Sequence, residues 1–233
     1  MKIIAIKGKK LLIWIFVLIA VFVFLSFSYI EHRTSTIPKT GLTIVLDPGH
    51  GGIDGGSVGV NTGIKESDLN LEIALKTKNF LEKLGISCIL TRKDENGLYK
   101  IFGRGYKQED MNARREIIEK VDADGVISIH QNSFTESSAR GINVYHAEDS
   151  QAGEVFAKDV LCCLDGQVDN VKSLPKVGDF YMVNCTTAPS ILVECGYLSN
   201  PSDEALLITS EYQNKLAYAI ACGVLKFFNI NYY

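Results

Sequence analysis

Two histidines and two glutamates of this chain stand in sequence settings that favour metal-assisted chemistry. His50 lies in the glycine-rich run Asp-Pro-Gly-His-Gly-Gly, and Glu66 lies just before a helical pattern. His130 and Glu194 each follow an apolar run typical of a buried strand. Two imidazoles and one carboxylate leave zinc a fourth position for water, and a further carboxylate nearby can accept the proton of that water. The sequence therefore predicts a hydrolytic zinc centre.

The neighbours of each residue support this prediction to different degrees. The glycines around His50 provide too few side chains to pack a buried imidazole, which favours a ligand. His130 is followed by polar residues, among them Asn132, that could orient the imidazole or contact a substrate. An apolar strand carries Glu194 into the sheet, where a carboxylate needs a metal, a cation or a catalytic role. Glu66 could instead only complement the dipole of the helix that follows it.

Other catalytic arrangements find little support in the sequence. There is no His-Glu-x-x-His, the commonest helical zinc-protease pattern, so the ligands would come from separated loops. Neither His50 nor His130 has an obvious serine partner in the sequence, so a nucleophilic serine is poorly supported. The six cysteines include no Cys-x-x-Cys pair, which disfavours a structural zinc knuckle, and we expect them to be free.

The alternation of strand and helix patterns predicts one α/β domain. Its central sheet would be mostly parallel or mixed, with about six strands flanked by helices, and the zinc site would lie at strand ends. The expected strands are 43–47, 86–91, 125–129, 141–145, 179–183 and 190–195. The expected helices are 68–84, 111–121, 151–164 and 211–228, the last of them opened by a capping box from Ser210 to Gln213.

The N-terminal part of the chain has the pattern of a membrane anchor. Residues 1–10 are basic, and residues 11–30 form an uncharged apolar run long enough to cross a bilayer as a helix. The positive-inside rule then places everything beyond the run outside the cytoplasm. Residues 31–41 read as a linker and 42–233 as the catalytic domain. We expect an extracytoplasmic, anchored protein, with a cleaved and secreted form as the alternative.

The overall composition indicates the size of the domain and limits the kinds of partner that the protein can bind. The chain has 233 residues, 46% of them hydrophobic, which suits one sizeable domain. Its formal net charge is −3 and its pI is about 5.8, so it lacks the basic excess with which proteins neutralise phosphates. We therefore expect no nucleic-acid partner.

The segments around His50, Glu66, His130 and Glu194 together resemble the zinc-dependent N-acetylmuramoyl-L-alanine amidases, a family of peptidoglycan hydrolases. The resemblance spans about residues 43–228, and the stretch that begins at Glu194 is similar to the family's catalytic Glu-x-Gly-Phe-Leu-Ser-Asn. Two departures are Ser67, where the family usually has Lys, and Tyr197, where it has Phe. Neither departure changes a metal-binding atom.

The resemblance implies roles for individual residues. His50, Glu66 and His130 would bind Zn²⁺, and Glu194 would be the catalytic acid and base. Arg114 matches a basic position of the family and would either bind a substrate carboxylate or form only an ion pair within its helix. The bond cleaved would join the lactyl group of N-acetylmuramic acid to the α-amino group of L-alanine. A lone catalytic domain behind one anchor is similar to the spore-cortex, germination-specific amidases, which prepare peptidoglycan for muramic-δ-lactam formation.

Other functions fit parts of the same pattern. A zinc peptidase acting on peptidoglycan stem peptides would share the metal and the base, and it would release a different product. A peptidoglycan-binding protein without catalysis would need none of the four residues, and neither would an anchored scaffold. An accessory protein that regulates the enzyme is also compatible with the sequence.

Overall fold

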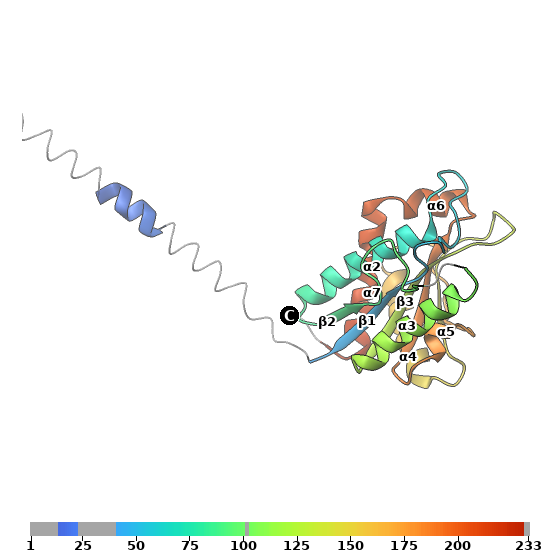
Figure 1. The fold of residues 1–233 in the computed structure, drawn as a ribbon. Helices are drawn as coiled ribbons and strands as arrows, with labels where there is room; N and C mark the ends of the chain where they lie inside the picture. The colour runs from blue at the N-terminus through green and yellow to red at the C-terminus, as the bar shows by residue number, and fades with distance from the viewer. Residues whose placement is uncertain (1–13, 23–40, 101–102, 231–233) are drawn as a thin grey trace, which may run out of the picture. The chain divides into compact units, whose positions relative to one another are not determined.

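The structure, a computed structural model, describes residues 14–22, 41–100 and 103–230 (Figure 1). The chain divides into two compact units, Met1–Pro38 and Lys39–Tyr233.

In the first unit, residues 14–22 form a helix with exposed apolar side chains. The rest of the expected membrane segment at 11–30 lies outside the described residues, as do the basic stretch 1–10 and all but the last residue of the linker 31–41. Within the described parts of the chain, no helix has both the length and the apolar character needed to span a bilayer. The anchor therefore stays a prediction.

The second unit is built on one mixed sheet of six strands, as the sequence predicts (Figure 1). The strands lie in the order β2-β1-β3-β6-β4-β5, and only the β4–β6 pair is antiparallel. Their bounds are β1 Thr43–Pro48, β2 Ser87–Leu90, β3 Gly125–Asn132, β4 Asn143–His146, β5 Lys176–Val177 and β6 Ser190–Tyr197. The central strands β1, β3 and β6 run parallel, so their carboxyl ends meet at one edge of the sheet.

Helices cover both faces of the sheet. They are α2 Glu66–Lys83, α3 Tyr106–Lys120, α4 Gln151–Asp165, α5 Tyr181–Asn184, α6 Pro201–Leu207 and α7 Ser210–Phe227. Alternate residues of a strand point to opposite faces, so Ile44 and Leu46 of β1 pack with α2, α4 and α7. Val45 packs on the other face with Ile118 of α3 and Met182 of α5. Burial of each such side chain contributes about 1.5–3 kcal/mol.

The structure corrects the predicted strand at 179–183. That stretch contains the short helix α5 instead, and the edge strand β5 lies just before it. The neighbouring residues Met182 and Val183 are both buried. A helical turn can bury neighbours in this way, whereas successive residues of a strand point to opposite faces. An apolar run this short does not distinguish the two structures by its pattern alone.

Three further differences from the predicted elements concern helices. α3 begins at Tyr106 rather than at residue 111, directly after Gly105, whose φ of 98° favours glycine. α6 was not expected, although Asn200 caps it with its side chain and Pro201 opens it. α7 is capped by Thr209, whose hydroxyl accepts from Tyr212 N–H, so the expected box from Ser210 to Gln213 is wrong.

Candidate functional site

His50 lies in the turn that follows β1. It has a φ of 62°, in the left-handed region, and Gly51 and Gly52 after it also have positive φ. A tight turn then pairs Gly51 with Asp54 through backbone hydrogen bonds in both directions. This turn brings Asp54 Oδ1 to 2.9 Å from His50 Nδ1. The imidazole therefore meets a carboxylate on its Nδ1 side, which leaves Nε2 to face the centre of the site.

Glu66 is the first residue of α2, not the last residue of the loop before it. Its carboxylate is buried, and Oε1 lies 3.1 Å from His50 Nε2 and 2.9 Å from His130 Nδ1. Oε2 accepts a hydrogen bond of 2.8 Å from Ser57 N–H. A Cβ at Gly56 would approach Glu66 Oε2 to 2.5 Å, so only glycine fits there. The glycine-rich loop thus packs directly against this carboxylate.

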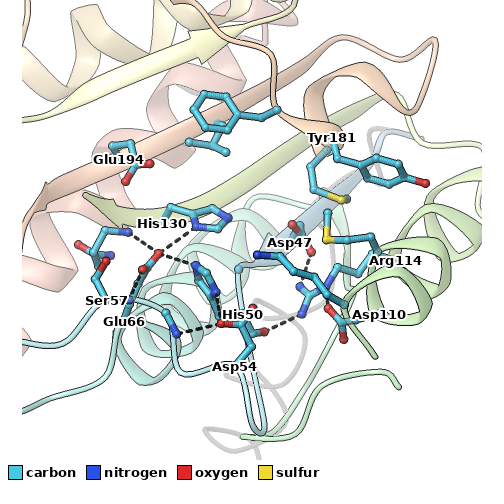
Figure 2. A pocket seen from close by; sticks show the side chains of 18 of the residues that line it. Asp47, His50, Asp54, Ser57, Glu66, Asp110, Arg114, His130, Tyr181 and Glu194 are labelled. Carbon is cyan, nitrogen blue, oxygen red and sulfur yellow. Dashed lines mark hydrogen bonds and ion pairs between the residues drawn. The ribbon is translucent and has the colours of Figure 1, made fainter. Parts of the chain in front are cut away.

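His130 and Glu194 come from neighbouring parallel strands. His130 of β3 is paired in register with Glu194 of β6, and both strands continue for two or three residues beyond them. His130 and Glu194 thus lie within their strands rather than at the strand ends. Figure 2 shows the Glu194 carboxylate on the same side of the pocket as His130, His50 and Glu66. The structure therefore brings together all four residues singled out in the sequence.

The His50, Glu66 and His130 side chains suit a divalent metal. Each offers one ligand atom, and these atoms all lie within 4.8 Å of one another. Zinc bonds of about 2.0–2.1 Å in a tetrahedron place neighbouring ligand atoms roughly 3.3 Å apart. The observed separations of 3.1 and 2.9 Å from Glu66 Oε1 are close to that value. The nitrogen and oxygen donors are also the types that zinc prefers.

The charge of the metal-free cluster fits the same interpretation. Burial works to lower the pKa of His50, but Asp54 and Glu66 outweigh it and raise that pKa to about 9. Burial works to raise the pKa of Glu66, but His130 and His50 hold it well below its ordinary value. Two carboxylates thus attract positive charge to this point, which a proton supplies in the absence of a metal.

Glu194 has the environment of a group that can exchange a proton near neutral pH. Burial raises its pKa to about 7, aided by the negative charge of Glu66 and opposed by His130 and His50. Its Oε2 is buried and has no hydrogen-bond partner among the residues that the structure describes. A buried acceptor without a partner is available to a water or a substrate group.

Two buried arginines hold the turn that carries His50. Arg92 donates to the carbonyl oxygens of Pro48 and Gly49, at 2.9 and 3.0 Å. Arg114 donates to the carbonyl oxygens of Pro48 and His50, at 2.8 and 2.6 Å. Sequence reasoning missed Arg92, because these contacts join segments far apart in the chain and no local pattern signals them.

Arg114 is also the centre of a buried ion-pair network. Its guanidinium contacts Asp47 at 2.7 Å and Asp110 at 2.6 Å. Burial works to raise the pKa of Asp47, but Arg114 and the hydroxyls of Thr91 and Ser128 outweigh it and lower that pKa. Of the two roles open in the sequence, the ion pair within its helix matches the Asp110 contact, and the contacts to β1 extend it.

Replacing Arg114 by Met should therefore destabilise the domain strongly. The change leaves two buried carboxylates without their partner, which costs about 3–5 kcal/mol and lowers the melting temperature by roughly 10 °C. Thermal unfolding measures the effect. The matched control is Arg115→Met, because the neighbouring Arg115 pairs with Glu119 on the exposed surface and should leave the midpoint nearly unchanged. A stable Arg114→Met protein with a raised KM would instead indicate substrate binding.

The four site residues open into a pocket of about 620 Å³. Asn132, the last residue of β3, lines it, and its Oδ1 accepts a hydrogen bond from Ser133 N–H. Asp54 and Tyr181 line it as well and were not expected from the sequence. Asp54 could have been found, since a carboxylate four residues after a candidate ligand in a glycine-rich loop can reach back to it. Tyr181 gives no such signal.

The folded unit matches a known protein family. The family described as N-acetylmuramoyl-L-alanine amidase matches residues 44–226, which include His50, Glu66, His130 and Glu194. The germination-specific N-acetylmuramoyl-L-alanine amidase of Bacillus subtilis (strain 168) is 34% identical over 197 residues, covering 83% of this chain and 82% of that protein.

Two solved structures have the same fold. The CwlD amidase from Clostridioides difficile, determined in complex with the GerS lipoprotein, superposes with a TM-score of 0.78 at 35% identity and covers 82% of this chain and 100% of that one. The catalytic domain of CwlV, an N-acetylmuramoyl-L-alanine amidase from Bacillus (Paenibacillus) polymyxa var. colistinus, gives a TM-score of 0.72 at 29% identity over 82% of this chain and 99% of that one.

Proposed function

Because this chain belongs to the N-acetylmuramoyl-L-alanine amidase family of peptidoglycan hydrolases, we propose that it works with zinc held by His50, Glu66 and His130. As a member of the family it is an enzyme that cleaves the amide bond between N-acetylmuramic acid and L-alanine. The observation that carries the zinc proposal is the convergence of three ligand atoms within 4.8 Å of one another, beside Glu194 on the adjoining strand. When bound, zinc supplies Lewis acidity that lowers the pKa of water and polarises the scissile carbonyl.

The protein side chains provide the proton transfers. Glu194 accepts a proton from the attacking water through its unpartnered Oε2, then donates it to the nitrogen of the departing L-alanine. A pKa of about 7 suits a group that must act as a base and then as an acid. Asn132, at the end of β3, contacts the substrate in this proposal, whereas Arg114 keeps the His50 turn in place.

Asp54 should tune the affinity for zinc through His50. A carboxylate on the outer nitrogen of a ligand histidine fixes the orientation and the tautomer of the ring, and loss of such a partner typically costs 10–100-fold in metal affinity. We expect Asp54→Ala to weaken zinc binding by about that factor, measured by competition with a fluorescent chelator. Asp149→Ala, on an exposed turn, is the control. An unchanged zinc affinity in the Asp54→Ala protein would show that Asp54 does not tune zinc binding through His50.

Zinc binding should release protons at neutral pH. The metal-free protein keeps a proton on His50, whose pKa is about 9, and zinc must displace it. The apparent affinity for zinc therefore rises with pH until about 9 and then levels off. Calorimetric titration at pH 7 in buffers of different ionisation enthalpy measures the protons released. Release of none would contradict the assignment of His50 as a ligand.

We also propose a role in the spore cortex. A germination-specific amidase and CwlD are both about one-third identical to this chain over most of its length, which supports the preparation of peptidoglycan for muramic-δ-lactam formation. The basic residues and the apolar run at the N-terminus support an extracytoplasmic enzyme anchored in the membrane. CwlD was solved with a lipoprotein, which supports an accessory protein as a partner of this chain as well.

Product analysis tests the reaction itself. The full-length chain is incubated with peptidoglycan, with and without chelator, and the soluble fragments are identified by mass and by N-terminal labelling. The amidase releases intact stem peptides that carry a new N-terminal alanine. Free amino acids or dipeptides would indicate a zinc peptidase instead, and the absence of any cleavage would favour a peptidoglycan-binding protein.

A further inference from the structure

The pocket has a second end, beyond the metal cluster, with a different chemistry. Figure 2 shows Tyr181, Asp110 and Arg114 across the pocket from His130 and Glu194. Aromatic side chains gather among the residues that line the pocket: Tyr99, Tyr106, Phe180 and Tyr181. The rings of Tyr99 and Tyr106 meet edge to face, with centroids 5.3 Å apart. Such walls suit the flat and apolar parts of a peptide.

Lys107 also lines the pocket and brings a positive charge to it. Arg114, the other lysine or arginine that lines the pocket, is engaged by Asp47 and Asp110. Among the described residues, the Lys107 ammonium forms no ion pair or hydrogen bond, and its side chain is exposed.

The position of Lys107 in its helix gives no structural reason for a cation. It is the second residue of α3, and a positive charge in the first turn opposes the helix dipole. The same turn contains Glu109, the charge that a helix N-terminus favours. An unpaired lysine in an unfavourable helix position, on the rim of a catalytic pocket, is better explained by a ligand than by stability.

We propose that Lys107 binds a carboxylate on the peptide part of the substrate and makes the enzyme prefer anionic stem peptides. The inference rests on the proposed function and extends it to specificity. Cleavage of the amide at L-alanine leaves a peptide as the departing group, and a peptide that is not cross-linked ends in a carboxylate. In this proposal the aromatic side chains that line the pocket contact the peptide, and the Lys107 ammonium pairs with the negative charge of the peptide.

Two matched substrates test this preference. One is a muramoyl dipeptide with a free terminal carboxylate, and the other is the same molecule with a terminal carboxamide. The full-length wild-type chain should have a KM about fivefold lower for the carboxylate, as expected for one partly exposed ion pair. Lys107→Gln should lose this preference, and Lys107→Arg should retain most of it. Added salt should weaken the preference of the wild type, because it screens the pair.

Binding measured without turnover separates this inference from the proposed function. Zinc-loaded Glu194→Gln protein is titrated with each dipeptide, with and without the Lys107→Gln change. Lys120→Gln, at the far end of the same helix on an exposed position, is the control that changes net charge equally. Equal affinities for the two dipeptides would overturn the role of Lys107, and so would a preference that survives the Lys107→Gln change. Neither result would contradict the amidase activity of the proposed function. A wild type that cleaves neither dipeptide nor peptidoglycan would overturn the proposed function.

Discussion

Replacing Glu194 by Gln lowers kcat by roughly 10² to 10⁴-fold while zinc stays bound, because an amide of the same shape cannot accept the proton of the attacking water. The Glu194 carboxylate is buried on β6 with its Oε2 free of partners in the described part of the chain. It lies beside the proposed ligands without belonging to their cluster. The release of alanine-terminated peptide measures the rate, and elemental analysis of the purified protein measures the zinc.

The control for this change is Glu148→Gln, which alters an exposed glutamate on the turn before α4 and should leave both readings unchanged. If Glu194→Gln protein retained the wild-type rate, Glu194 would not be the base. If it lost zinc as well as activity, Glu194 would act as a ligand, and the separation of roles between Glu194 and Glu66 would be wrong.

Replacing His130 by Ala removes both the bound zinc and the activity. His130 supplies one of only three protein ligands in the proposed site, so we expect the loss in zinc affinity to exceed the 10–100-fold typical of an outer hydrogen-bond partner. Chelator should inactivate the wild-type enzyme, and added zinc should restore it. The same zinc concentration should fail to restore the His130→Ala protein.

His146→Gln is the matched control, since His146 lies on β4 outside the cluster of ligand atoms. It should bind zinc as the wild type does. Thermal unfolding of the metal-free proteins checks that His130→Ala remains folded. A His130→Ala protein that is folded, zinc-loaded and active would exclude His130 as a ligand.

The sheet and most helices could be predicted because their apolar periodicity is strong. Ile44 and Leu46 alternate with residues facing the other side, and the runs before His130 and Glu194 are apolar enough to mark central strands. The register that places His130 opposite Glu194 follows from strand pairing between distant segments. The sequence indicates the two strands, and no local pattern shows that they are neighbours.

The residues around the site were harder to predict from the sequence than the four site residues themselves. Asp54, Arg92 and the network around Arg114 depend on contacts between side chains and carbonyl groups of distant segments. The α5 segment was wrongly expected to be a strand, because its few apolar residues fit either period. The metal-binding roles of His50, Glu66 and His130 stay predictions, and the structure adds that their side chains converge.

The most direct test of the account adds zinc stepwise to the metal-free full-length chain in the presence of peptidoglycan. The rate at which new N-terminal alanine appears is the readout. The account predicts no release without zinc, a rate that rises in proportion to added zinc, and a plateau at one zinc per chain. Full activity in the metal-free protein would contradict the account. So would zinc binding that saturates at one zinc per chain without release of any alanine-terminated stem peptide.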